Sequence, residues 1–480
     1  MNDKIRNLFG LVIVLFGTLV FATSWWTIDE LGAKGIKDNP HNRRQLLEQM
    51  QHPRGLILAD NGTVLAANRS TGHGETKRYY RYYPQNGLFA HAVGYYFVSK
   101  GSAGTEKEYD DALAGRENEF ASTIDQLLGH RQEGEDVRMT LDPNAQRVAL
   151  QALAGRKGAV VAMEPDTGRV RVMASDPGYN PNLITSKGGI GGAASTLNRV
   201  TQGRYPPGST MKVVTAAAAL DTGRYNPNSF ISGKSPKVIS GVPLNNFGGE
   251  NFGAISLTDA LTHSVNTVFG EVGEKLGRST MLKYMKRFGF QKKPPLDYPS
   301  DEMIASGVFP ARACGGNGRD YDFGRVAIGQ ECHLFVTPLQ MATVVAAVAN
   351  KGVRMKPQLV ERITSKDGRV KQSFHPERAA VVMSPRSASQ LTEMMRHVVE
   401  EGTGTAARLA GISVAGKTGT AEIPGTTENQ VWFVGFAPAD NPKMVVAATI
   451  ERTQGEGGTV AAPIAKQVLQ ALLGKAASNG

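Results

Sequence analysis

Ser209 and Lys212, a serine and a lysine three residues apart, could together supply the nucleophile and base of an acyl transfer. Pro206 and Pro207 precede them and the apolar run 213–220 follows, which predicts a buried helix starting near the serine. On a helix this spacing puts both side chains on one face, about 5–6 Å apart at Cβ. A lysine shielded from water could lose its proton near neutral pH and accept one from the serine. A surface serine beside a solvated lysine is the alternative, and the apolar helix speaks against it.

A second lysine lies in GISVAGKTGT, residues 411–420, which fits the nucleotide-binding pattern G-x-x-x-x-G-K-[ST]. That loop works between a strand and a long helix whose N-terminus faces the phosphates. Residues 412–415 alternate and are β-prone, so they predict a strand, while Pro424 and Gly425 exclude a long helix after the motif. We therefore expect Lys417 on a strand and no nucleotide site.

A third group of polar residues lies in SLTDALTHSVNTVFG, residues 256–270. Ser256 with Asp259 is typical of a capping box, so a helix should start there and Ser264 and Asn266 should fall near its far end. A serine hydroxyl can relay a proton, and an asparagine amide can hydrogen-bond a peptide. Alone, S-x-N is a weak signal.

The order of the three motifs carries more weight than any one of them. S-x-x-K at 209, S-x-N at 264 and K-T-G at 417 are the motifs of the penicillin-recognising serine acyl-transferases, and this chain resembles that superfamily. Other stretches resemble class B penicillin-binding proteins; they are Arg54-Gly55 with Asp60-Asn61-Gly62, Arg81-Tyr82-Tyr83-Pro84 with Ala90-His91 and Gly94-Tyr95, Gly104 with Glu106 and Tyr109-Asp110, Gly329-Gln330 with Thr337-Pro338-Leu339-Gln340, and residues 432–438. One departure is Thr105, where the family often has leucine. The resemblance covers most of residues 54–475.

The resemblance implies a peptidoglycan D,D-transpeptidase with no cofactor and no metal. The serine would attack a terminal D-Ala-D-Ala of a stem peptide and release D-alanine, a neighbouring stem-peptide amine would then form the cross-link, and β-lactams would trap the acyl-enzyme. The implied site comprises catalytic Ser209, Lys212, Ser264, Asn266 and Lys417 and substrate-binding Thr418, Gly419 and Thr420. Backbone N–H groups of Ser209 and Thr420 would form the oxyanion hole.

Several other functions are compatible with these motifs or with this domain organisation. A D,D-carboxypeptidase, a β-lactamase and a β-lactam sensor would use the same motifs. A β-lactamase more usually lacks a module like residues 29–136, and a sensor would need a cytoplasmic signalling segment. A non-catalytic scaffold of the division machinery would retain the first domain with a vestigial serine. By analogy alone, a glycosyltransferase and division or elongation proteins are the expected partners.

The elements that must position these residues indicate an α+β domain over residues 137–475. Asp142 and Pro143 predict a helix to about residue 154, and two β runs joined at 166–168 follow. Periodicity is mostly helical from 190 to 350, strand patterns return at VWFVGFAP and MVVAATIE, and an apolar face predicts a C-terminal helix. The resemblance implies the serine β-lactamase and penicillin-binding transpeptidase fold, an antiparallel sheet with a helical subdomain.

Residues 29–136 are expected to form a small mixed α/β pedestal of the dimerisation type. Apolar runs flank Asp60-Asn61-Gly62, and Asn-Gly favours a hairpin with a type I′ turn.

The N-terminus predicts a membrane anchor over residues 8–28 after a cytoplasmic stub of residues 1–7. Leu8 to Trp26 are nineteen residues without a charge, close to the about 20 that span a bilayer. Lys4 and Arg6 precede this run, so the positive-inside rule places everything after residue 28 outside the cytoplasm. A cleaved signal peptide with a small-residue site at 22–24 is the alternative.

Composition is that of a globular protein with a net charge of +11. The basic residues are scattered and do not alternate with aromatics, so we expect no nucleic-acid partner. The two cysteines, Cys314 and Cys332, could form a disulfide in an exported domain or stay as buried thiols, and their spacing does not fit a metal site.

Overall fold

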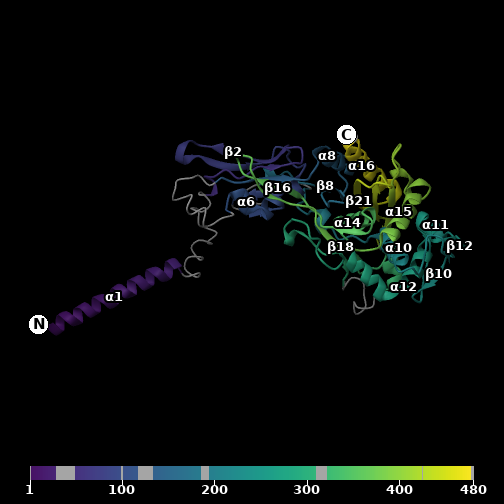
Figure 1. Cartoon of the computed structure of the whole chain (residues 1–480), viewed down its shortest axis with the longest axis horizontal. Helices are drawn as coiled ribbons and strands as arrows, with labels where there is room; N and C mark the ends of the chain where they lie inside the picture. Colours follow the sequence, from purple (N-terminus) through teal and green to yellow (C-terminus); the bar gives the residue numbers. More distant parts are fainter. Residues whose placement is uncertain are drawn as a thin grey trace.

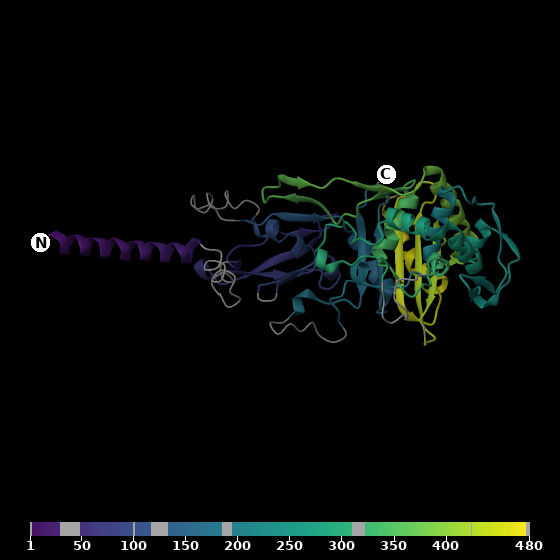
Figure 2. The same ribbon diagram turned by 90° about the horizontal axis from the view of Figure 1, so that it is seen from below.

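The computed structural model of the chain describes residues 2–28, 49–98, 101–116, 133–184, 194–309, 322–423 and 425–476. Helix α1 (Asn2–Ile28) lies at one end, an N-terminal domain follows, and the larger C-terminal domain is farthest from α1 (Figures 1 and 2). The three parts follow one another along the long axis of the molecule. Cys332 is disulfide-bonded, and Cys314 lies outside the described residues.

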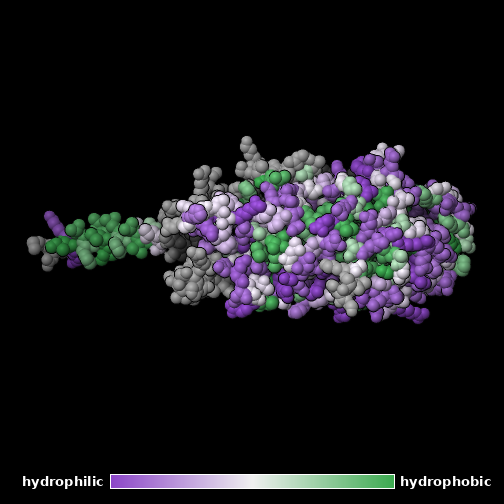
Figure 3. Space-filling model, turned by 90° about the horizontal axis from the view of Figure 1, so that it is seen from above, coloured by the Kyte–Doolittle hydropathy of each residue, from purple (hydrophilic) through white to green (hydrophobic). Residues whose placement is uncertain are grey.

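Helix α1 has the length and composition of a membrane span. Its segment Lys4–Trp25 has a mean hydropathy of 2.1 and no buried part. Its surface is apolar along most of its length, in contrast to the mixed surface of the two domains (Figure 3). This agrees with the predicted span, although a signal sequence has the same properties.

A six-stranded sheet in the order β17-β16-β6-β1-β2-β3 forms the N-terminal domain. Its strands are β1 (Ile57–Leu58), β2 (Val64–Thr71), β3 (Arg78–Tyr82), β6 (Asp136–Met139), β16 (Val360–Thr364) and β17 (Val370–Ser373). The hairpin β16–β17 thus returns from far along the chain to extend this sheet (Figure 2). The boundary predicted between residues 136 and 137 falls inside β6.

The predicted hairpin at Asp60-Asn61-Gly62 is confirmed, because β1 and β2 pair antiparallel. The predicted type I′ turn is wrong. Gly62 alone among the turn residues, all of which the structure describes, has a positive φ, +85°, and the Ala59 amide donates to the Thr63 carbonyl oxygen. A type I turn closed by a left-handed glycine needs only one residue in that conformation, whereas type I′ needs two.

Short elements complete the N-terminal domain. They are η1 (Gly74–Thr76), α4 (Ala90–Val93), β4 (Tyr95–Phe97), β5 (Gly101–Ala103), α5 (Thr105–Glu108) and α6 (Asp110–Ala114). Thr105, at the position where leucine was expected, is buried and donates its hydroxyl to the Ala92 carbonyl oxygen at 3.0 Å. Its polar group is therefore satisfied, which makes threonine compatible with this core.

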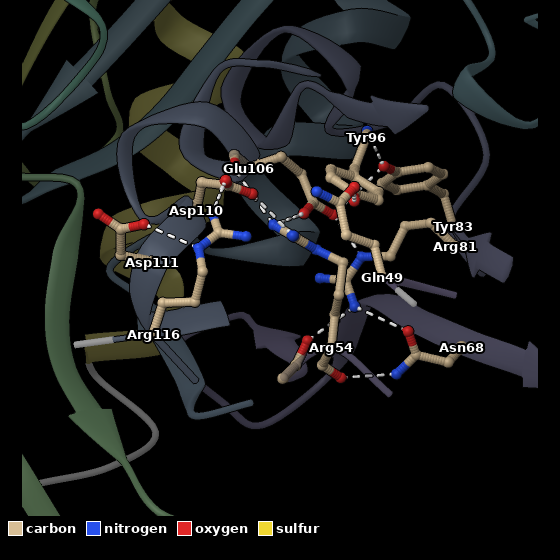
Figure 4. Close-up of polar contacts among 11 residues, drawn as sticks. Gln49, Arg54, Asn68, Arg81, Tyr83, Tyr96, Glu106, Asp110, Asp111 and Arg116 are labelled. Carbon is tan, nitrogen blue, oxygen red and sulfur yellow. Dashed lines mark hydrogen bonds and ion pairs between the residues drawn. The ribbon is translucent and has the colours of Figure 1, made fainter. Parts of the chain in front are cut away.

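A fully buried carboxylate holds the N-terminal domain together (Figure 4). Glu106 accepts from Arg54 at 3.2 Å, from Arg81, and from the Tyr83 hydroxyl at 3.2 Å. Arg54 also donates to Asp110 at 2.7 Å. These are residues of the N-terminal motifs on which the resemblance rested, and the structure shows that they meet in one ion-pair network. Removing the Glu106 charge from this network would leave buried Arg81 without its ion-pair partner.

The C-terminal domain is built on a five-stranded antiparallel sheet in the order β19-β20-β21-β7-β8. Its strands are β7 (Gly158–Met163), β8 (Val170–Asp176), β19 (Ala415–Glu422), β20 (Asn429–Ala437) and β21 (Met444–Thr453). The predicted hairpin 158–176 and both late strands are therefore confirmed. Strand β19 is an edge strand, and the segment 412–414, predicted to be strand, lies before it. Gly411 takes φ +71° in a turn that delays the strand to Ala415.

Alternating strand residues face two cores, one on each side of this sheet. Helices α8 (Pro143–Leu153) and α16 (Ala462–Ala476) cover one face, and α14 (Pro338–Ala349) covers the other. The predicted N-cap is confirmed, because the Asp142 carboxylate accepts from the Asn144 and Ala145 amides. Ile464, Val468, Leu469 and Leu472 are buried, so the apolar face of the C-terminal helix is also confirmed.

A helical subdomain lies around α10 and α12 (Figure 1), and its helix α15 and turn η3 contact the edge strand β19. Its helices are α10 (Lys212–Asp221), α11 (Leu257–Thr262), α12 (Asn266–Arg287), α13 (Phe323–Ile328) and α15 (Pro385–Glu400), with the single turn η3 (Gly208–Met211) before α10. The remaining elements are η2 (Pro181–Leu183), α9 (Arg199–Gln202), β9 (Phe230–Ser232), β10 (Lys237–Ile239), β11 (Val242–Leu244), η4 (Phe247–Gly249), β12 (Ala254–Ser256), η5 (Ser300–Glu302), β13 (Gly307–Val308), β14 (Leu334–Phe335), β15 (Val353–Met355), β18 (Arg378–Val381), η7 (Thr405–Ala407) and η8 (Gly457–Ala461).

Candidate active site

Ser209 lies on the turn η3, where the helical subdomain meets the edge strand β19. The structure differs here from the prediction, because Ser209 is in a single 3-10 turn and the α-helix begins only at Lys212. As a result, the Ser209 and Lys212 side chains point in more nearly the same direction, because residues three apart lie directly above one another on a 3-10 helix. Ser209 is partly exposed and lines a cleft of about 660 Å³.

Glycines let the backbone around Ser209 pack closely on both sides. A Cβ on Gly208 would come within 2.9 Å of the Thr420 carbonyl oxygen, and one on Gly329 would overlap the Gly208 carbonyl oxygen. Gly329 ends α13 with φ +74°, and its own carbonyl oxygen accepts from the Gly208 amide at 3.1 Å. The turn that carries the serine is thus clamped between β19 and the end of α13.

Lys212 is fully buried and its ammonium faces the S-x-N segment. Its Nζ lies 2.6 Å from the Ser264 carbonyl oxygen, 2.7 Å from Asn266 Oδ1 and 3.2 Å from Ser264 Oγ. Ser264 stands between α11 and α12 with φ +59°, an uncommon conformation for a non-glycine residue that occurs preferentially at functional sites. Ser256 caps α11 as predicted, since its Oγ accepts from the Asp259 amide at 3.0 Å.

Lys417 reaches the same hydroxyl from the opposite wall of the cleft. Its Nζ donates to Ser264 Oγ at 2.9 Å and to the Thr418 carbonyl oxygen at 3.1 Å. It lies on β19, and the next element that the structure describes after β19 is the strand β20, with which it pairs. A phosphate-cradling loop is therefore excluded, as the sequence predicted.

Burial gives both lysines unusual acid-base properties. Burial and, secondarily, the neighbouring Lys417 cation lower the pKa of Lys212 well below its usual value. Burial also lowers the pKa of Lys417 to about 7. A neutral Lys212 has two N–H groups and one lone pair. The Ser264 and Asn266 carbonyl oxygens can only accept, so they take both N–H groups, and the lone pair is left for a hydroxyl proton.

The predicted substrate-binding residues lie along β19 beside the nucleophile. Thr418 and Thr420 line the cleft together with Ser209, Ser264 and Asn266. Gly419 packs against the nucleophile turn, because a Cβ there would come within 2.9 Å of the Pro207 carbonyl oxygen. The structure therefore brings all eight predicted site residues to one place.

Two further residues shape the site and were missed from the sequence. The Thr403 and Thr418 hydroxyls are 2.6 Å apart, which fixes the orientation of the K-T-G threonine. Trp432 is fully buried and donates its indole N–H to the Pro206 carbonyl oxygen at 3.0 Å, just before the nucleophile turn. No sequence pattern around Thr403 indicates a role in the site. Trp432 belongs to the stretch 432–438 that resembles the family, but no role had been assigned to it. Among the described residues, no group of three or more His, Cys, Asp or Glu side chains is placed to hold a metal ion.

Comparison with known proteins gives consistent matches over most of the chain. Residues 158–470 match the family described as the penicillin-binding protein transpeptidase domain, and residues 54–137 match the penicillin-binding protein A dimerisation domain. A peptidoglycan D,D-transpeptidase, PbpA, of Mycolicibacterium smegmatis is 33% identical, and the match covers 98% of this chain and 99% of the relative.

Solved structures of similar sequence also have a similar fold. The ceftriaxone acyl-enzyme complex of penicillin-binding protein A from Mycobacterium tuberculosis has a TM-score of 0.80 at 30% identity and covers 89% of this chain and 100% of its own. The D,D-transpeptidase domain of a peptidoglycan glycosyltransferase from Eggerthella lenta has a TM-score of 0.77 at 33% identity, covering 88% of this chain and 99% of its own.

Proposed function

This chain belongs to the penicillin-binding protein transpeptidase family, and from that premise we propose how its residues carry out peptidoglycan D,D-transpeptidation. The chain is a serine-type acyl transferase that acts on stem peptides and is acylated by β-lactams. One observation carries the assignment of roles: two buried lysines, Lys212 and Lys417, converge on the hydroxyl of Ser264 beside Ser209.

In the acylation step, Ser209 Oγ attacks the carbonyl carbon between the two terminal D-alanines. Neutral Lys212 takes the serine proton, and the lowered pKa of this buried lysine favours its neutral form. The carbonyl oxygen becomes an oxyanion held by the backbone N–H groups of Ser209 and Thr420, where one donor is worth about 3–4 kcal/mol. As the C–N bond breaks, the proton passes through the Ser264 hydroxyl to the departing nitrogen, and free D-alanine leaves an ester on Ser209.

In the second step, the amine of a neighbouring stem peptide attacks the ester carbonyl. Its proton returns along the same path, through Ser264 to Lys212, and then to Ser209 Oγ as the C–O bond breaks. The product is a new amide and the free enzyme, so the proton balance closes without any further reactant. A tethered leaving group, as in an opened β-lactam ring, stays in the path of the acceptor and holds the enzyme at the ester.

Substrate is positioned by β19 and the S-x-N segment. Lys417, Thr418 and Thr420 bind the carboxylate of the terminal D-alanine, because a cation beside two hydroxyls is a good carboxylate site. Gly419 lets the strand approach the nucleophile turn. Asn266 accepts from Lys212 at its Oδ1 and donates from its Nδ2 to the Asn245 carbonyl oxygen at 3.2 Å, so the second N–H of Nδ2 would donate to the stem-peptide amide.

Helix α1 anchors the protein in the cell membrane, with residues 1–7 in the cytoplasm and both domains outside. Its apolar surface supports the span, and Lys4 and Arg6 at its N-terminal end support the orientation. The N-terminal domain then acts as the pedestal and surface for protein partners, a glycosyltransferase and division or elongation proteins.

The proposal is tested with a synthetic donor that ends in D-Ala-D-Ala and an added amine acceptor. Transpeptidation predicts that D-alanine release is matched by the amide product, that the amide-to-hydrolysis ratio rises with acceptor concentration, and that Ser209→Ala abolishes both. Hydrolysis alone at saturating acceptor would indicate a D,D-carboxypeptidase. No reaction with donor or penicillin would indicate a non-catalytic scaffold.

A further inference from the structure

A second and larger cavity adjoins the catalytic cleft at the far end of β19. It has a volume of about 1030 Å³, and Gln330, Glu422 and Asn429 line both spaces. The catalytic cleft is therefore open toward this side cavity, at the end of β19 away from Lys417. The roles assigned so far use nothing inside it.

The direction of a bound donor peptide follows from the proposed function, on which this inference rests. The leaving D-alanine lies at Lys417 and Thr418, and the acyl carbonyl lies at Thr420. The rest of the donor therefore continues along the strand toward Glu422. A strand advances about 3.3 Å per residue, so the donor residue before the acyl D-alanine lies beside residues 421–422. Its side chain reaches the mouth of the side cavity.

Strand β21 is locally distorted so that consecutive side chains face this cavity. In a regular strand, Glu451 and Arg452 would point to opposite faces. Here β21 has one extra residue relative to β20 between residues 450 and 453, Arg452 takes φ +49°, and both side chains line the cavity. Bulges that redirect side chains in this way are over-represented beside active sites.

Most charged groups of the side cavity already have partners. Glu451 accepts from Arg199 at 2.8 Å and from the Tyr205 hydroxyl at 2.5 Å, and Arg452 donates to Glu428 at 3.1 Å. Glu331 likewise accepts from the Asp322 amide at 3.2 Å and pairs with His333 at 2.9 Å.

Two opposite charges of the side cavity remain uncommitted. The side chains of Arg204 and Glu422 are exposed, and neither makes an ion pair or side-chain hydrogen bond within the described part of the chain. A guanidinium binds a carboxylate, and a carboxylate binds an ammonium group. A ligand that satisfies both must carry one charge of each sign.

We propose that the side cavity is a donor subsite for a diamino-acid side chain that ends in an amino-acid head group. Its carboxylate binds Arg204 and its ammonium group binds Glu422. The subsite selects the stem peptide by the residue before the acyl D-alanine. A side chain that ends in an ammonium group alone would bind only Glu422, and one that ends in a carboxylate alone would bind only Arg204.

The test compares three donors that differ only at that residue: diaminopimelate, lysine and 2-aminopimelate, each followed by D-Ala-D-Ala. D-Alanine release is measured with full-length protein and a fixed excess of glycinamide as acceptor. Wild type should give a kcat/KM about fivefold higher with diaminopimelate than with either other donor, the upper range for exposed ion pairs. Arg204→Ala should bring the diaminopimelate-to-lysine ratio to about 1. Glu422→Gln should do the same for the diaminopimelate-to-aminopimelate ratio.

Ratios between donors on one variant cancel any general loss of activity or folding. Arg386→Ala is the matched control, because Arg386 is exposed at the end of α15 away from Thr403, and it should keep both wild-type ratios. Equal kcat/KM for all three donors in wild type would overturn the subsite, and so would unchanged ratios in both variants. Wild-type acylation by penicillin separates the two proposals, since its absence would instead refute the proposed function.

Discussion

Replacing Gly329 with alanine should disturb the active site without changing any residue that touches substrate. The added Cβ would overlap the Gly208 carbonyl oxygen, and φ at this position is +74°. Left-handed backbone costs a non-glycine residue about 1–2 kcal/mol, and overpacking costs about 1–3 kcal/mol more. The free energy of unfolding should therefore fall by roughly 2–5 kcal/mol. Relief of the overlap must move the turn that carries Ser209, and a shift of about 1 Å can cost up to about a hundredfold in rate.

Gly223→Ala is the matched control for this variant. Gly223 has φ +69° and follows α10, and a Cβ added there would meet no atom within 4 Å, so alanine carries the backbone cost alone. Denaturant unfolding and stopped-flow acylation by a labelled penicillin give the two quantities. Gly329→Ala should lose more stability than the control and should also acylate slowly, whereas the control should acylate at the wild-type rate. Equal stability and equal acylation of the two variants would refute the idea that α13 clamps the nucleophile turn.

Three other substitutions test separate parts of the molecule. Ser264→Ala removes the hydroxyl shared by both lysines and should slow acylation about a hundredfold or more, the range for losing a positioned proton-transfer group; a loss below threefold in stopped-flow traces would contradict the relay. Lys417, with a pKa of about 7, is a cation below that pH and loses its charge above it. After normalisation at pH 6, the acylation rate of Lys417→Arg relative to wild type should therefore rise through pH 7–8, and a flat ratio would count against the carboxylate role. Glu106→Gln should cost about 3–5 kcal/mol of unfolding free energy, because buried Arg81 loses the carboxylate with which it pairs and Arg54 keeps only Asp110. Its exposed neighbour variant Glu108→Gln should change little in the same urea titration.

The sequence located the reacting residues but not their backbone conformations. Serine, lysine and asparagine spacing identified Ser209, Lys212 and Asn266, and chain order linked them to Lys417. The 3-10 turn at Ser209 and the left-handed Ser264 were not predictable, because both conformations are imposed by packing against β19 and Lys212. Thr403 was missed for the same reason, since its contact with the K-T-G threonine exists only once distant segments pack together.

Strands were likewise easier to predict than their partners. Continuous apolar runs identified β7, β20 and β21 as strands, and most of their residues are buried on both faces of the sheet. The sequence did not predict that the hairpin β16–β17 joins the N-terminal sheet. Hydrophobic periodicity indicates which face of a strand is buried, but not which strand it pairs with. The charge network around Glu106 is similar, since its members are far apart along the chain and meet only in the folded domain.

Every role assigned to the active-site residues depends on Ser209 being the residue that becomes acylated. Intact-mass measurement of the full-length protein after exposure to penicillin, followed by peptide mapping, tests it directly. We expect one adduct of the mass of the whole antibiotic, on the peptide that contains Ser209, and none on Ser209→Ala. An adduct on another residue, or an adduct that persists in Ser209→Ala, would contradict it.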